Sequence, residues 1–152
     1  MKPMRLFPGI LTALLFAVPA ARAESTAFST FTVPVSGTLV GAPENVSCKG
    51  PVRLSVMVQK DALTPHANAI VTVDTTALKC HGKSTGVSYL NTGHAILTRI
   101  LSLTDHLEAS IAVYPDRPDG HLQARTANLA LKLSYNLSSA ALVKASGTLS
   151  SP

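Results

Sequence analysis

Tryptophan is absent from this chain, and only four phenylalanines and three tyrosines supply aromatic rings among its 152 residues. A core built on large rings is therefore excluded, and valine, leucine, isoleucine and alanine must fill the interior. Serine and threonine are left to cover much of the surface. This composition favours strands over helices, because β-branched side chains fit a pleated sheet.

Long apolar runs are also scarce. The one clear run, Leu6 to Ala21, follows two basic residues and ends in Ala21-Arg22-Ala23, which has small residues at the two positions that a signal peptidase reads. This three-part pattern predicts a secretory signal peptide over residues 1–23. The run is shorter than the roughly 20 apolar residues that a membrane span needs. We expect residues 24–152 to form one exported domain without a membrane span, in a secreted, periplasmic or cell-surface location.

Charge of one sign does not accumulate anywhere. Three of the 13 basic residues lie in the predicted signal peptide, whereas all 8 acidic residues lie beyond it, so the remainder carries 10 basic against 8 acidic residues. The basic residues are spread singly along the chain. A nucleic-acid-binding protein normally gathers them on one face. We therefore expect no nucleic-acid partner.

Cysteine occurs only twice, at Cys48 and Cys80. Two cysteines behind an export signal predict a disulfide bond formed in an oxidising compartment. A catalytic redox pair usually has the spacing Cys-X-X-Cys, which this pair does not have. The bond should tie together two early strands of the fold.

Alternating apolar and polar residues predict strands through most of residues 24–152. Turn-forming stretches separate them, the strongest being Pro115-Asp-Arg-Pro-Asp-Gly120. About eight short strands at nearly regular spacing predict an all-β fold, an antiparallel β-sandwich of immunoglobulin-like kind. The expected strands are Phe31–Leu39, Val52–Val58, Ala69–Thr75, Val87–Leu90, Ala95–Leu103, Leu107–Val113, Leu129–Leu137 and Leu142–Leu149.

Two of these segments carry further information. In Ala95–Leu103 the apolar residues fit a strand and also a helical stripe; the hydroxyl side chains there disfavour a helix, so we expect a strand and leave the helix open. Pro34 cannot donate to a ladder and places the first strand at an edge or a bend. The tetrapeptide Ser36-Gly-Thr-Leu39 recurs as Ser146-Gly-Thr-Leu149, which is too short to establish a repeat.

Residues that could carry chemistry form no recognisable site. None of the five histidines pairs with another at the i, i+2 or i, i+4 spacing that brings side chains to one face. No serine stands in a nucleophile-elbow motif, and the acidic residues are scattered. We expect no catalytic, cofactor-binding or metal-binding residues and a non-enzymatic role. Two alternatives stay open: a periplasmic protein that binds a small ligand or metal between loops 60–68, 81–86 and 115–121, and a small secreted hydrolase.

The extended segment Phe28 to Val35, the following Ser-Gly-Thr-Leu39 and the two cysteines at positions 48 and 80 resemble the layout of bacterial chaperone–usher fimbrial subunits. The resemblance implies an exported, incomplete immunoglobulin-like sandwich with one disulfide, a role in a fimbrium or in cell adhesion, and other protein subunits as partners. It also implies assembly by β-strand addition, in which an arm completes the sheet of a neighbour. The arm residues would be Phe28, Phe31, Val33 and Val35. Alternatively, the same residues form the first strand of a self-contained domain.

Overall fold

The computed structural model describes residues 25–60, 66–117 and 121–152, and the predicted signal peptide lies outside these residues. The described residues form nine strands. No helix long and apolar enough to cross a membrane occurs among them. The strands are β1 Ser25–Leu39, β2 Val46–Lys60, β3 Ala67–Asp74, β4 Lys79–Gly82, β5 Ser88–Asn91, β6 His94–Ile100, β7 Thr104–Pro115, β8 Arg125–Asn136 and β9 Ala141–Ser150.

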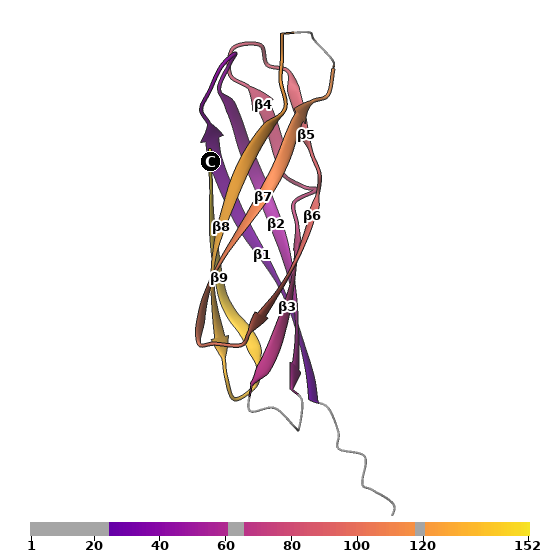
Figure 1. Cartoon of the computed structure of the whole chain (residues 1–152), viewed down its shortest axis with the longest axis vertical. Coiled ribbons are helices and arrows are strands. Elements are labelled where there is room, and N and C mark those ends of the chain that lie inside the picture. Colours follow the sequence, from indigo (N-terminus) through magenta and orange to yellow (C-terminus); the bar gives the residue numbers. More distant parts are fainter. Residues whose placement is uncertain (1–24, 61–65, 118–120) are drawn as a thin grey trace, which may run out of the picture.

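Hydrogen-bonded neighbours follow the order β6-β3-β2-β4-β5-β7-β8-β9, with β1 on β2, and the pairs are antiparallel. This series of paired strands folds over into two layers, so that β7 and β8 cross in front of β1 and β2 (Figure 1). The predicted antiparallel β-sandwich with one disulfide is confirmed, with nine strands in place of about eight.

The core lies between the two layers and follows the alternation read from the sequence. In β7 every second residue is buried, from Asp105 to Val113. In β8 the buried residues include Leu129, Leu131 and Leu133. Burying each such leucine contributes about 1.5–3 kcal/mol, and a one-residue slip would turn the whole set towards solvent. The aliphatic core that the composition predicted is therefore present.

The structure shows where the ambiguous segment around residues 95–103 and Pro34 lie. The segment that fitted both a strand and a helix is a strand, β6, over His94–Ile100. Pro34 stands directly opposite Pro51 in the β1–β2 ladder. Neither residue has a backbone N–H, so the pair suits a position where opposite residues exchange no hydrogen bonds.

The first and last strands, β1 and β9, lie against each other and run in the same direction. The amide of Leu142 donates to Ser29 Oγ at 3.2 Å, and the amide of Val40 donates to Ser151 Oγ at 2.7 Å. A Cβ added to Gly37 would collide with the backbone carbonyl of Leu149. The repeated Ser-Gly-Thr-Leu segments therefore sit on adjoining strands, where glycine permits close approach.

Candidate functional site

The predicted arm forms the N-terminal part of β1, and its side chains divide between two faces. Val33 and Val35 are buried in the core, and Phe31 packs against it from a partly buried position. Phe28 points the other way and is 68% exposed. The whole of β1 pairs with β2, from Ser25–Lys60 to Leu39–Val46. Within this chain, then, the arm is the first strand of its own sheet.

Phe28 begins a row of apolar side chains on the outer face of this layer. Its partner on β2 is Met57, and the partner of Met57 on β3 is Ile70. On β6, Ile96 and Ile100 flank the next position in the row and are 70% and 63% exposed. We call these five side chains the outer apolar patch. Side chains directly opposite or diagonal on one sheet face are close enough to touch, so the patch is continuous across four strands.

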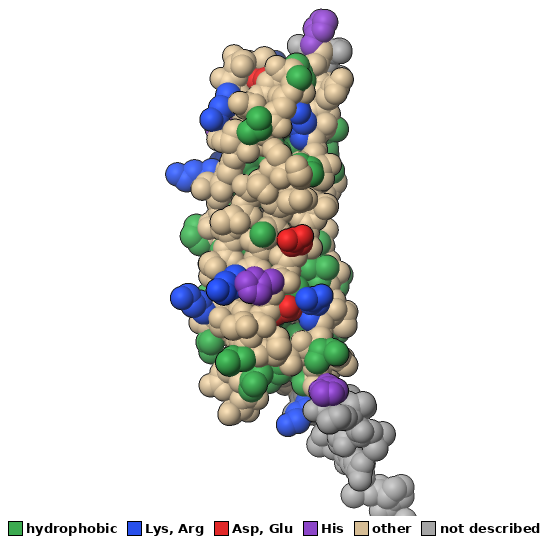
Figure 2. Space-filling model, turned by 60° about the vertical axis from the view of Figure 1, so that its left-hand side comes forward, with side chains coloured by type: hydrophobic (Ala, Val, Ile, Leu, Met, Phe, Trp, Pro, Cys, Tyr) green, Lys and Arg blue, Asp and Glu red, His purple; other side chains and the backbone are tan. Residues whose placement is uncertain are grey.

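The outer face of the second layer has a different character. Across β7, β8 and β9, one row reads His106, Lys132, Ser146, and its neighbour reads Thr104, Ser134, Lys144. Figure 2 shows a histidine with basic and acidic side chains gathered on this side, and apolar side chains towards its lower end. The two broad faces of the sandwich therefore differ: one carries a continuous apolar patch, and the other carries mainly hydroxyl and charged groups, with Tyr114 and Val143 exposed separately.

Met57 and Ile70 are the members of the outer apolar patch that the sequence pattern itself distinguishes. Each stands between two buried residues of a strand, as in Val56-Met57-Val58, and so puts an apolar side chain where the alternation calls for a polar one. An apolar residue at an outward position marks a candidate contact surface. Their alignment with Phe28 could not be read in this way, because it depends on the register between strands.

Of the three loops predicted as lips of a ligand site, residues 61–65 and 118–120 lie outside the described residues. The described parts of the loops at 81–86 and 115–121 line one hollow together, whereas the described part of the loop at 60–68 lies at the other end of the sandwich. Lys60 pairs with Ala67 at one end of β2, whereas Val46 pairs with Gly82 at the other end. Each end has its own hollow, of about 470 Å³ and about 320 Å³. The larger is lined by Thr26, Ala27, Val58, Lys60, His66, Ala67, Leu101, Leu137, Ser138, Ser139 and Ala140, and the smaller by Thr85, Gly86, Val87, Ser88, Asp116 and Arg117.

No group of three or more histidine, cysteine, aspartate or glutamate side chains that could hold a metal ion occurs within residues 25–60, 66–117 and 121–152. His94 lies 3.8 Å from a carboxylate oxygen of Asp74, across the β3–β6 pair. Hydrogen bonds from the backbone and side chain of Thr76 hold the pKa of Asp74 below its usual value. These contacts order the end of β3.

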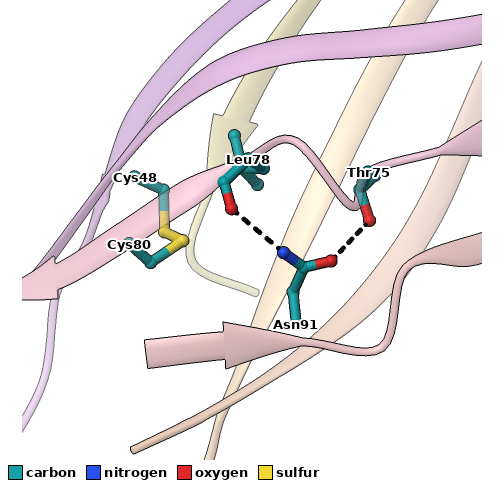
Figure 3. The surroundings of a disulfide bond; sticks show 5 residues. All are labelled: Cys48, Thr75, Leu78, Cys80 and Asn91. Atoms are coloured by element: carbon teal, nitrogen blue, oxygen red, sulfur yellow. Dashed lines mark hydrogen bonds between the residues drawn. A yellow bond between two sulfur atoms is a disulfide. The ribbon is translucent and has the colours of Figure 1, made fainter. Parts of the chain in front are cut away.

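Cys48 and Cys80 form the predicted disulfide, which joins directly opposite residues of β2 and β4. Both cysteines are buried. Beside them the Asn91 side chain donates to the carbonyl oxygen of Leu78 at 3.1 Å and accepts from the Thr75 hydroxyl at 2.9 Å (Figure 3). The disulfide and this amide bridge together fasten β4 and β5 to the rest of the sheet, which is a structural role.

A buried carboxylate that the sequence did not mark, Glu44, organises the end of the sandwich near β4. It accepts hydrogen bonds from the amides of Ser84 and Thr85, both at 3.1 Å, from the Thr85 hydroxyl at 2.8 Å and from the Tyr89 hydroxyl at 3.3 Å. Burial raises the pKa of Glu44, but these hydrogen bonds outweigh it and hold the pKa below its ordinary value of 4.5. Arg125 donates to the backbone carbonyls of Gly41 and Glu44 and secures the same loop. Since its acceptors are filled from within, we assign Glu44 a structural role.

Replacing Glu44 by glutamine should lower the melting temperature at neutral pH, because the amide group would face backbone donors. The folded-state pKa of Glu44 lies below 4.5, so its stabilisation is present above that pH and is lost as the pH falls through the folded-state pKa. Thermal unfolding of Glu44→Gln should therefore depend less on pH below about 4.5 than that of the wild type. Parallel pH profiles for the two proteins would contradict this role.

At the opposite end of the sandwich, Asp105 occupies a core-facing position of β7. Arg99 binds it through two nitrogens, at 3.2 and 3.1 Å. The nearby hydroxyl of Tyr135 is buried and has no hydrogen-bond partner among the residues that the structure describes. Burial, aided by the charge of Asp105, raises the pKa of Tyr135 to about 12. Asp105 and His106 both lie within β7, with Asp105 facing the core and His106 facing outward.

Replacing Tyr135 by phenylalanine should stabilise the fold by about 1 kcal/mol, because it removes a buried hydroxyl that makes no hydrogen bond within the described part of the chain. Tyr89→Phe is the matched control. Its hydroxyl donates to Glu44, so its removal should destabilise. Denaturant titration of the two variants would show opposite signs, and equal losses of stability would refute the distinction.

In comparisons of the chain with protein-family models, curated proteins and solved structures, no match was found. Inferences about function therefore rest on the geometry described above.

Proposed function

We propose that this protein is an exported, non-enzymatic β-sandwich module that acts by protein assembly or adhesion, with the outer apolar patch as its contact surface. The observation that carries the proposal is the difference between the two broad faces. One face aligns Phe28, Met57 and Ile70 with two isoleucines of β6, whereas the rows of the other face are mainly hydroxyl and charged side chains, with Tyr114 and Val143 as separate exposed apolar residues. Contiguous exposed apolar surface marks interaction sites in soluble proteins.

Export is supported by the disulfide, because such bonds persist in oxidising compartments. Assembly in the manner of fimbrial subunits also belongs to this proposal, but strand addition by Phe28 to Val35 would require β1 to leave β2, with which it pairs over 15 residues. In addition, β9 pairs with β8 from Asn136–Ala141 to Asn128–Ser150 and supplies a last strand from within the chain. Contact through the outer apolar patch needs neither displacement and is the form of assembly that we favour.

Site-specific photo-crosslinking tests the contact surface. A photoreactive phenylalanine analogue replaces Phe28 in the full-length protein, produced in cells that export it. The matched control carries the same analogue at Thr148, on the polar face of the other layer. We expect crosslinked protein adducts from position 28 and few from position 148. Equal labelling at the two positions, or none at position 28, would refute the proposed surface.

A further inference from the structure

Strand β6 has a free edge. It pairs with β3 through seven residues, Asn68–Ile100 to Asp74–His94, and within the described parts of the chain no strand pairs with its other side. In Figure 1 it runs along one long side of the molecule. An edge strand presents unpaired backbone groups that can pair with another strand.

Several of the features by which proteins usually block such an edge are missing from β6. The strand has no proline and no lysine, and its register against β3 is continuous. Its one permanently cationic residue, Arg99, is bound to Asp105 of the same chain. Ile96 and Ile100 place exposed apolar side chains beside the edge. The edge is therefore suited to pairing with another strand.

We propose that β6 pairs with β6 of a second copy of this chain, antiparallel and about a two-fold axis at Leu97. Ile96 of each copy then lies opposite Thr98 of the other, and His94 opposite Ile100. The same residues serve on both sides, as a two-fold interface requires. The proposal extends the proposed function, because it names a partner for the sheet that carries the outer apolar patch.

The charge of Arg99 favours this antiparallel pairing over an in-register parallel pairing of the two β6 strands. In the antiparallel pairing Arg99 of one copy lies opposite Ala95 of the other, so no like charges face each other. An in-register parallel pairing would set Arg99 beside Arg99 of the second copy, and like charges directly opposite on a sheet are destabilising.

The second copy also brings its own Phe28, Met57 and Ile70 into the same continuous sheet. The dimer thus doubles the apolar surface offered to other partners.

Two double variants test the register. Ile96→Lys with Thr98→Lys would set lysine opposite lysine twice across the axis, whereas Ile96→Lys with Thr98→Glu would set lysine opposite glutamate twice. Both positions are exposed on the sheet face, so the two variants make matched demands on the fold. By sedimentation velocity over a concentration series at low salt, we expect a dimer for the wild-type protein. The lysine–lysine variant should raise the dissociation constant about tenfold or more relative to the lysine–glutamate variant.

Hydrogen exchange of the wild-type protein provides a second measurement that needs no variant. The β6 amides that face the free edge should exchange more slowly at concentrations where the dimer forms, whereas the alternate amides already bond to β3. Each of three results would overturn the proposal. The wild-type protein could stay monomeric, hydrogen exchange in β6 could be unchanged, or the two double variants could have equal dissociation constants. Phe28→Ser, three strands away, should leave the dimer intact. If the wild-type protein is monomeric but the analogue at position 28 still forms crosslinked adducts, the β6 dimer is rejected and the proposed contact surface is not.

Discussion

Removal of the disulfide by Cys48→Ala with Cys80→Ala should lower the free energy of unfolding by about 3.5–4 kcal/mol, among the largest effects of any change in this chain. The bond joins residues 32 apart in the sequence, so the unfolded chain gains the freedom of a long loop when the bond is absent. The bond also fastens β4, a strand of only four residues, to β2. Denaturant unfolding of the oxidised wild type and of the double variant measures the difference.

Reduced wild-type protein is the control for this experiment. If the loss of the covalent bond is responsible, the reduced protein and the double alanine variant should have similar stability, both well below that of the oxidised protein. A double variant as stable as the oxidised protein would show that β4 is held by other contacts, such as the Asn91 bridge to Leu78.

Gly37→Ala should destabilise the fold by about 3 kcal/mol, because its methyl group would occupy the position of the Leu149 carbonyl and force β1 and β9 apart. Backbone atoms cannot rotate away as the end of a side chain can. The measurement is again the free energy of unfolding by denaturant titration, with circular dichroism to verify that the strands are retained.

Gly147→Ala is the informative control, since it lies on the partner strand within the second copy of the same tetrapeptide. Its added Cβ would meet the ends of the Leu131 and Val35 side chains, each at 2.9 Å, and these can shift. We expect a loss of about 1 kcal/mol there. Equal losses at the two glycines would argue against the backbone contact as the cause.

Where local alternation dominated, the sequence predicted the fold well. Leu107–Val113 and Leu129–Leu137 alternate clearly, and both coincide closely with strands, β7 and β8. Strand β4 was missed because Lys79–Gly82 is too short to show a period and is held by pairing with β2 and by the disulfide. The start of β2 at Val46 was missed for a related reason, since Gly50 and Pro51 resemble a turn.

The candidate site was harder to predict because it depends on register. Phe28 was grouped with Phe31 and the two valines as one arm, although its position in the alternation places it on the opposite face. Whether Phe28 meets Met57 depends on how β1 slides along β2, which no local pattern determines. Glu44 shows the same limit: an acidic residue after a proline reads as an exposed loop until its donors, 40 and more residues away, are known.

The parallel course of β1 and β9 bears on how the domain would carry mechanical load. Ser25 and Ser150 lie at opposite ends of these strands, because both run in the same direction along the sandwich. Tension applied through these two positions would pull each strand along its own axis, in shear. The hydrogen bonds of the β1–β2 and β8–β9 ladders lie across that axis and would have to yield together. Such a geometry resists extension better than one in which strands unzip pair by pair, because many hydrogen bonds must break at once.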